Sequence, residues 1–247
     1  MISLESYLAL YLLPLIANKG DLMALLSQNS KMKKSSQNGT DIYNFGIPAY
    51  KSETGLITCP QAKHCIAGCY ARSGTYNFSN VKNAYENRLK ATQSETFVDL
   101  MVAEINLKLV QSVAKDNTCL IRIHDSGDFY NMSYIAKWLI IMEKMPQCKF
   151  YAYTKQVVLF KEINRLKQLP NNFTVIYSFG GTEDSHIDTD KDRHARVFQN
   201  ETDLLCKGYA DGTNDDRIAA FGPNHRIGLI YHGVKNYANT TWSKQGV

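Results

Sequence analysis

The sequence lacks a transmembrane-length run of apolar residues and several familiar catalytic motifs. Its longest apolar segment, residues 7–17, has eleven residues, whereas a helix that crosses a bilayer needs about twenty. A secretory signal would have basic residues ahead of that segment, but the only charged residue there is Glu5. Neither a Gly-x-x-x-x-Gly-Lys phosphate loop nor a Gly-x-Ser-x-Gly nucleophile elbow occurs. We therefore expect a cytoplasmic protein that does not enter a membrane.

Concentrated positive charge is also missing. The chain has 28 Lys and Arg against 23 Asp and Glu, a net charge of +5, and the densest basic run is residues 31–34. Contact with nucleic acid is permitted by this charge but only weakly supported, because the lysines are spread along the whole chain. At 247 residues with 44% apolar content, the chain has the size and composition of one α/β domain.

Alternating short apolar runs and helical periodicities predict parallel βαβ units. The β-type runs are residues 119–123, 149–153, 173–179 and 227–231. The segments with helical period are residues 79–92, 95–114, 131–145 and 156–167. Residues 182–194 are expected to form an acidic loop. Ahead of these elements we expect an N-terminal helical segment, residues 1–28, followed by a single α/β domain, residues 29–247, with irregular structure up to residue 58.

The carboxyl ends of the first three β-type runs are small or polar. In parallel α/β folds, ligands bind at the carboxyl ends of the strands, so these residues are candidates for a pocket. The three ends are His124 to Asp128, Thr154-Lys155, and Ser178 to Thr182.

Three of the six cysteines, Cys59, Cys65 and Cys69, lie within eleven residues, and the other three stand alone. Three thiols in one loop can converge on one centre with little loop-closure entropy. A structural zinc site uses four ligands, so three thiols leave one coordination position open. We expect a metal centre and favour an iron–sulfur cluster. The alternative is a zinc site closed by His64 or Cys206.

The segment from His124 to Asp128 has the composition of a ligand-binding turn. Gly127 followed by the carboxylate of Asp128 would let backbone carbonyls and one acid approach a ligand amine closely, and His124 could relay protons. Taken alone, the same residues equally describe a strand-to-helix turn, with Asp128 or Asn131 as the helix N-cap.

The order of these motifs resembles the phage gene product 88 domain family over about residues 30–180. The matching stretches are Phe45 to Ala49, Cys59-Pro60 through Cys65 to Cys69-Tyr70-Ala71, Arg122 to Phe129, and Tyr151 to Lys155. The order also resembles that of radical S-adenosylmethionine enzymes. This second resemblance implies an incomplete (β/α) barrel of parallel strands, with a [4Fe–4S] cluster on the three cysteines.

The radical S-adenosylmethionine resemblance also assigns roles to the strand ends. It implies that Ser126, Gly127 and Asp128 receive the cofactor amino group and that His124 and Thr154 lie beside it; no catalytic residue is identified. The cysteine spacing here is Cys-x5-Cys-x3-Cys, whereas those enzymes use Cys-x3-Cys-x2-Cys. We expect either reductive cleavage of S-adenosylmethionine with an unknown substrate, or a zinc-stabilised phage protein that binds nucleic acid or a host protein, in the host cytoplasm.

Overall fold

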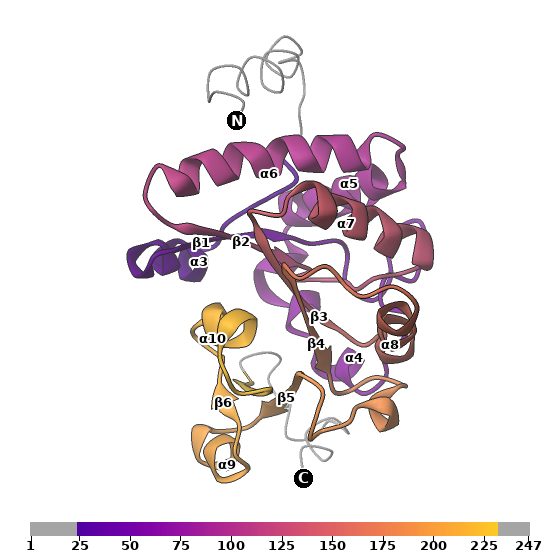
Figure 1. Cartoon of the computed structure of the whole chain (residues 1–247). Coiled ribbons are helices and arrows are strands. Elements are labelled where there is room, and N and C mark those ends of the chain that lie inside the picture. The colour runs from indigo at the N-terminus through magenta and orange to yellow at the C-terminus, as the bar shows by residue number, and fades with distance from the viewer. Residues whose placement is uncertain (1–23, 232–247) are drawn as a thin grey trace.

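Seven parallel strands form one sheet that curls into a half-barrel (Figure 1). The computed structural model describes residues 24–231. The strand order is β1-β2-β3-β4-β5-β7-β6, so the first five strands follow the chain, and β7 lies between β5 and β6. The strands are β1 Thr40–Phe45, β2 Thr118–Ile123, β3 Lys149–Thr154, β4 Phe173–Ser178, β5 His194–Phe198, β6 Ala210–Asp211 and β7 Arg226–Ile230.

The helices link the strands and cover the sheet. The longer ones lie along its outer side (Figure 1), and the shorter ones occur near the two ends of the described chain. The α-helices are α3 Ser30–Ser35, α4 Cys65–Gly68, α5 Ser79–Gln93, α6 Phe97–Val113, α7 Met132–Lys144, α8 Val157–Leu166, α9 Glu201–Cys206 and α10 Asp216–Phe221. As expected for a helix N-cap, the Asn131 side chain accepts a hydrogen bond from the Tyr134 backbone N–H at 2.8 Å.

The parallel α/β alternation is confirmed, and the four predicted helices and four predicted strands all occur within a few residues of their expected bounds. The expected N-terminal helical segment, residues 1–28, lies mostly outside the described residues. The prediction of a helix is wrong for its last five residues, 24–28, which are extended. Ser27 pairs with Asn44. The Glu104 carboxylate accepts hydrogen bonds from the backbone N–H groups of Leu25 and Leu26.

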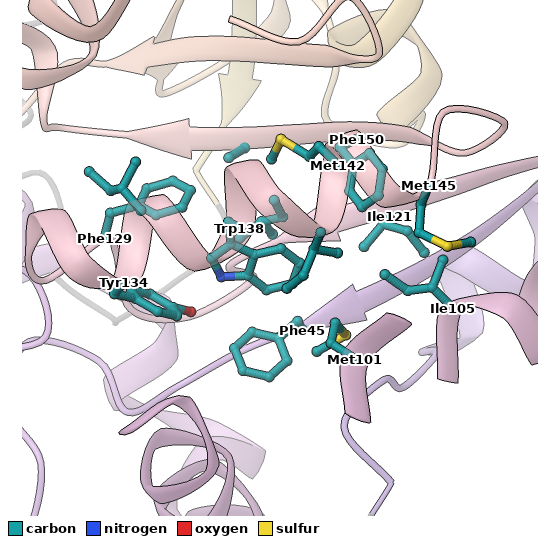
Figure 2. Packing of buried hydrophobic residues seen from close by; sticks show 14 of the residues in the cluster. Phe45, Met101, Ile105, Ile121, Phe129, Tyr134, Trp138, Met142, Met145 and Phe150 are labelled. Carbon is teal, nitrogen blue, oxygen red and sulfur yellow. The ribbon is translucent and has the colours of Figure 1, made fainter. Parts of the chain in front are cut away.

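The outer face of the sheet packs against α5 to α8 and forms the larger apolar core. Figure 2 shows Trp138 of α7 pointing toward Phe45 of β1 and Met101 of α6. The Trp138 and Phe45 ring centroids are 5.4 Å apart, and Phe97 lies 5.8 Å from each. All these side chains are buried. This core fixes the strand order and leaves the concave face of the sheet for other residues.

The concave face is filled only in its amino-terminal half. There Met32 of α3 and Ala219 and Ala220 of α10 pack against Leu120 and Ile227 of the sheet. The carboxyl-terminal half faces residues 49–71, which carry the three clustered cysteines. The described helices include none that is long and apolar enough to cross a membrane.

Candidate functional site

A cavity of about 180 Å³ opens at the carboxyl ends of the strands, on the concave face of the half-barrel. Its lining comes from the ends of β2, β3, β4, β5 and β7 and from residues 49–71. Cys59, Cys65 and Cys69 all line this cavity, together with the turn from His124 to Asp128. The chain therefore brings the predicted cysteine loop and the predicted ligand-binding turn to the same place.

Cys59 is positioned by a tight reversal of the chain after β1. Lys51 and Ile57 form an antiparallel bridge, and Tyr50 adopts a left-handed backbone conformation with φ of 65°. As a result, the backbone N–H of Tyr50 donates to the Cys59 Sγ at 3.2 Å. The Thr58 N–H donates to the Tyr50 carbonyl at 2.9 Å. The position of the Cys59 thiol is thus fixed by backbone hydrogen bonds.

Cys65 is held by the end of β4. The backbone N–H groups of Lys63 and Cys65 both donate to the Gly180 carbonyl, at 3.2 and 3.1 Å. Ala62 forms an antiparallel bridge with Gly181, where a Cβ atom would lie only 2.8 Å from the Gln61 carbonyl oxygen. Glycine is required at this point because the loop backbone approaches the sheet so closely.

Burial and nearby charge decide how the thiols titrate. Burial, assisted by the charge of Asp128, raises the pKa of Cys59 to about 12, and burial raises the pKa of Cys69. The ammonium of Lys155 lies close to all three cysteines. Burial alone would lower the pKa of Lys155, but Cys65, Asp128 and other acidic neighbours raise it. Lys155 is therefore a cation at neutral pH and can balance negative charge at the cysteines.

The remaining cysteines and His64 do not line the cavity. Cys206 is exposed on α9, and Cys119 and Cys148 are buried in the outer core. Across residues 24–231, no three His, Cys, Asp or Glu side chains are gathered closely enough to hold a single metal ion.

Asp128 ties the ends of β2 and β3 together. One carboxylate oxygen accepts from the Thr154 hydroxyl at 2.7 Å and from the Phe129 N–H at 2.8 Å, and the other accepts from the Lys155 N–H at 2.9 Å. Burial raises the pKa of this carboxyl, and these three donors oppose the rise. Thr154 is buried behind Asp128 and does not line the cavity. Its hydroxyl orients the carboxylate.

Gly127 allows the turn to lie directly against the chain that follows β1. Its φ is 83°, and a Cβ atom there would lie 2.3 Å from the Ile47 Cγ1. The Ile47 N–H donates to the Ser126 carbonyl at 3.0 Å, and the Asp128 N–H donates to the Thr58 carbonyl at 3.0 Å. Ser126 and Gly127 themselves line the cavity. Their backbone is therefore the part of the predicted turn best placed to meet a ligand.

The His124 ring packs in the aromatic core. It lies between Phe45, Phe129 and Tyr134, and its Nε2 is 2.8 Å from the Tyr134 hydroxyl. His124 itself has φ of 68°, which turns the chain at the end of β2. Burial lowers the pKa of His124 to about 3, so the ring is neutral at physiological pH. These contacts give His124 a packing role.

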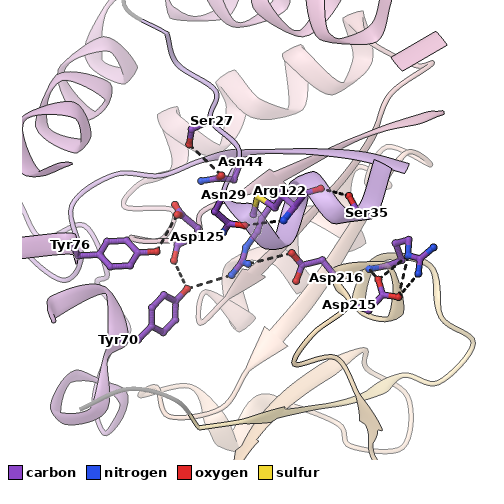
Figure 3. Close-up of polar contacts among 12 residues, drawn as sticks. Ser27, Asn29, Ser35, Asn44, Tyr70, Tyr76, Arg122, Asp125, Asp215 and Asp216 are labelled. Carbon is purple, nitrogen blue, oxygen red and sulfur yellow. Dashed lines mark hydrogen bonds and ion pairs between the residues drawn. The ribbon is translucent and has the colours of Figure 1, made fainter. Parts of the chain in front are cut away.

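A group of polar contacts around Asp125 that sequence reasoning missed lies beside the turn, as Figure 3 shows. The Asp125 Oδ2 accepts from Tyr85 at 2.8 Å and from Tyr76 at 3.2 Å, while the Asp125 carbonyl accepts from the Tyr70 hydroxyl. Burial raises the pKa of Asp125. Arg122 of β2 lies next to Tyr70. The sequence gives one signal for this group, which is the charged residue Arg122 inside the apolar run of β2. Charged residues are rare in buried strands, so such a residue indicates a specific role.

Comparison with known families gives one match, which agrees with the motif order. A family model described as gene product 88 matches residues 23–241, most of the chain. The chain belongs to the gene product 88 family. No curated protein and no solved structure matches it. The match extends well beyond residue 180, so the late strands β5 to β7 of this gene product 88 chain are part of the family domain.

Replacing Gly127 with alanine tests the close approach of the turn to Ile47. Gly39 provides a matched control, because its φ is 75° and a Cβ added there would meet nothing within 4 Å. Both substitutions cost roughly 1 kcal/mol for the left-handed backbone. Gly127→Ala should cost about 1–3 kcal/mol more, because the new methyl group overlaps Ile47. Urea denaturation measures both losses, and equal losses would show that the contact does not constrain the turn.

The buried neutral ring of His124 predicts a loss of stability in acid. The folded pKa is about 3, whereas the unfolded value is about 6.5. Between these values the unfolded chain binds one more proton, so the free energy of unfolding should fall by up to about 1.4 kcal/mol per pH unit as the pH drops. His124→Asn, which tolerates the left-handed backbone, should remove this component.

The matched control for that experiment is His186→Asn, at an exposed histidine. Urea midpoints between pH 7 and pH 5 should fall less steeply in His124→Asn than in the wild type or in His186→Asn. Parallel pH profiles for all three proteins would mean that His124 titrates in the folded chain.

Proposed function

We propose that this protein holds a [4Fe–4S] cluster on Cys59, Cys65 and Cys69 and cleaves S-adenosylmethionine reductively to act on a further substrate. The observation that carries the proposal is that all three thiols line one cavity at the carboxyl ends of a curled parallel sheet. In such folds this edge is where ligands bind. Bound there, the cluster would supply one electron at low potential, with one iron open to the cofactor.

The number of thiols at the cavity favours a cluster over a single zinc ion. A structural zinc ion is bound by four protein ligands. His64 and Cys206, the residues that could close such a site, do not line the cavity with the three cysteines. On a [4Fe–4S] cluster, three thiolates would leave one iron open to a further ligand.

Lys155 would set the charge at the cluster. Three thiolates on a [4Fe–4S] core carry net negative charge, and burying such charge requires a nearby cation. The Lys155 Nζ donates to the Ser178 hydroxyl at 3.0 Å, which fixes the ammonium on the cavity side of β3 and β4. Because added positive charge stabilises the reduced state, Lys155 would raise the reduction potential.

The turn after β2 would bind the amino acid part of the cofactor mainly through its backbone. Ser126 and Gly127 line the cavity, and Gly127 has no side chain to obstruct a ligand. Asp128 already accepts three hydrogen bonds from the protein, so its carboxylate chiefly holds the turn in place. Thr154 would act through Asp128. His124 would support the turn from the core side.

The test is an iron and acid-labile sulfide assay on protein purified without oxygen, with the visible spectrum recorded alongside. We expect about four iron and four sulfide per chain. Alanine at Cys59, Cys65 or Cys69 should abolish the cluster, whereas Cys206→Ala, a control at an exposed thiol on α9, should leave it unchanged. Reduced wild type should then convert S-adenosylmethionine to methionine and 5′-deoxyadenosine.

Two results would contradict the proposal. Stoichiometric iron and sulfide in the variant with all three cysteines replaced would place the cluster elsewhere. One zinc per chain without sulfide would replace the cluster by a structural metal site, which supplies no electron.

A further inference from the structure

Arg122 introduces a charge into the interior of the half-barrel. It lies on the concave face of β2, two residues after Leu120, which belongs to the inner apolar core. The side chain is only 15% exposed and lines the cavity. A buried guanidinium costs free energy unless its charge and its donors are satisfied, so its partners decide what it is for.

The protein satisfies Arg122 incompletely. Its closest described carboxylate oxygen, from Asp216, is 3.7 Å from Nη1, longer than a hydrogen bond, and the Tyr70 hydroxyl is 3.4 Å from Nη2. In the described part of the chain, the Nε has no hydrogen-bond partner. The guanidinium also lies over the Tyr153 ring, 5.5 Å from its centroid. A guanidinium has five donors, and these contacts use only part of them.

Tyr153 adds a second incompletely satisfied group at the same wall. It lines the cavity on β3, beside β2, and its hydroxyl is buried without a hydrogen-bond partner among residues 24–231. The guanidinium of Arg122 and the hydroxyl of Tyr153 both donate hydrogen bonds. Together they could bind the oxygen atoms of an anionic group such as a carboxylate or a phosphate.

We propose that Arg122 and Tyr153 bind a carboxylate or phosphate group of the substrate, whose apolar body lies against β5 and β7. The cavity lining on β5 and β7 includes the apolar side chains of Val197 and Leu229. This inference rests on the proposed function for its claim that the ligand is a substrate. The binding site itself depends only on the cavity and the two side chains.

The two cations of the cavity have different neighbours. Lys155 is close to Cys65, Asp128 and Cys59, so its positive charge would be balanced by these groups at the proposed cluster. Arg122 faces Asp216, and the nearby Asp125 carboxylate accepts from Tyr76 and Tyr85. Burial raises the pKa of Asp125, while the charge of Arg122 and the two tyrosine hydroxyls lower it. Arg122 is therefore the cation of the cavity left for an anionic ligand.

Matched probes test the site without any turnover. Hexanoate and hexyl phosphate carry the two anionic groups, and hexanamide is the neutral control of the same length. Calorimetry on the full chain should show binding of at least one anion and none of hexanamide. Arg122→Gln should weaken that binding about tenfold or more, the effect of losing a charge-assisted hydrogen bond. Arg122→Lys should weaken it less, and Tyr153→Phe measurably.

Lys155→Met is the matched control at the other cation, and it should keep anion binding. Loss of binding in Lys155→Met with retention in Arg122→Gln would overturn the proposal, as would equal binding of hexanamide or no binding of either anion. If Arg122→Gln does not fold, Arg122→Lys and Tyr153→Phe still decide the outcome. The variant with alanine at all three clustered cysteines separates the two proposals, because it should lose iron and sulfide but still bind the anion.

Discussion

The buried carboxylate of Asp128 is the contact on which the site depends. Its oxygens accept from the last residue of β3, from the residue that follows it and from its own turn. Its backbone N–H donates to Thr58, directly before Cys59. One residue thus joins two strand ends to the cysteine segment. Burying a carboxylate costs free energy unless its oxygens accept hydrogen bonds. Burial raises the pKa of Asp128, and the same loss of solvation makes these hydrogen bonds necessary.

Glycines make that arrangement sterically possible. Gly46, Gly127 and Gly181 lie where the cysteine segment and the chain after β1 contact the strand ends, and a Cβ at each would meet another atom within 3 Å. At Gly46 that atom is an oxygen of Asp125. The curvature of the sheet opens the cavity, but these close backbone approaches determine which side chains reach it. Small residues here serve the geometry of the site more than the stability of the core.

Much of the fold was predictable, because β2 to β4 and α5 to α8 are long enough for their periodicity to show. The elements α9 and α10, of six residues each, and β6, of two, are too short to give such a signal. In the site, Cys59, Cys65 and Cys69 were found from their spacing alone. Arg122 was not found, and Asp125 was named only as part of the segment from His124 to Asp128. Their contacts depend on strand face and on tyrosines 40 or more residues away in sequence.

The site is separable from the core that holds the fold together. None of the three clustered cysteines belongs to the apolar clusters, and Trp138, Phe97 and Phe45 pack on the opposite face of the sheet from the cavity. In small metal-dependent domains the metal is needed for folding, because the core alone is too small. Here the outer core spans four strands and four helices. The packing of this core therefore does not involve the three clustered cysteines.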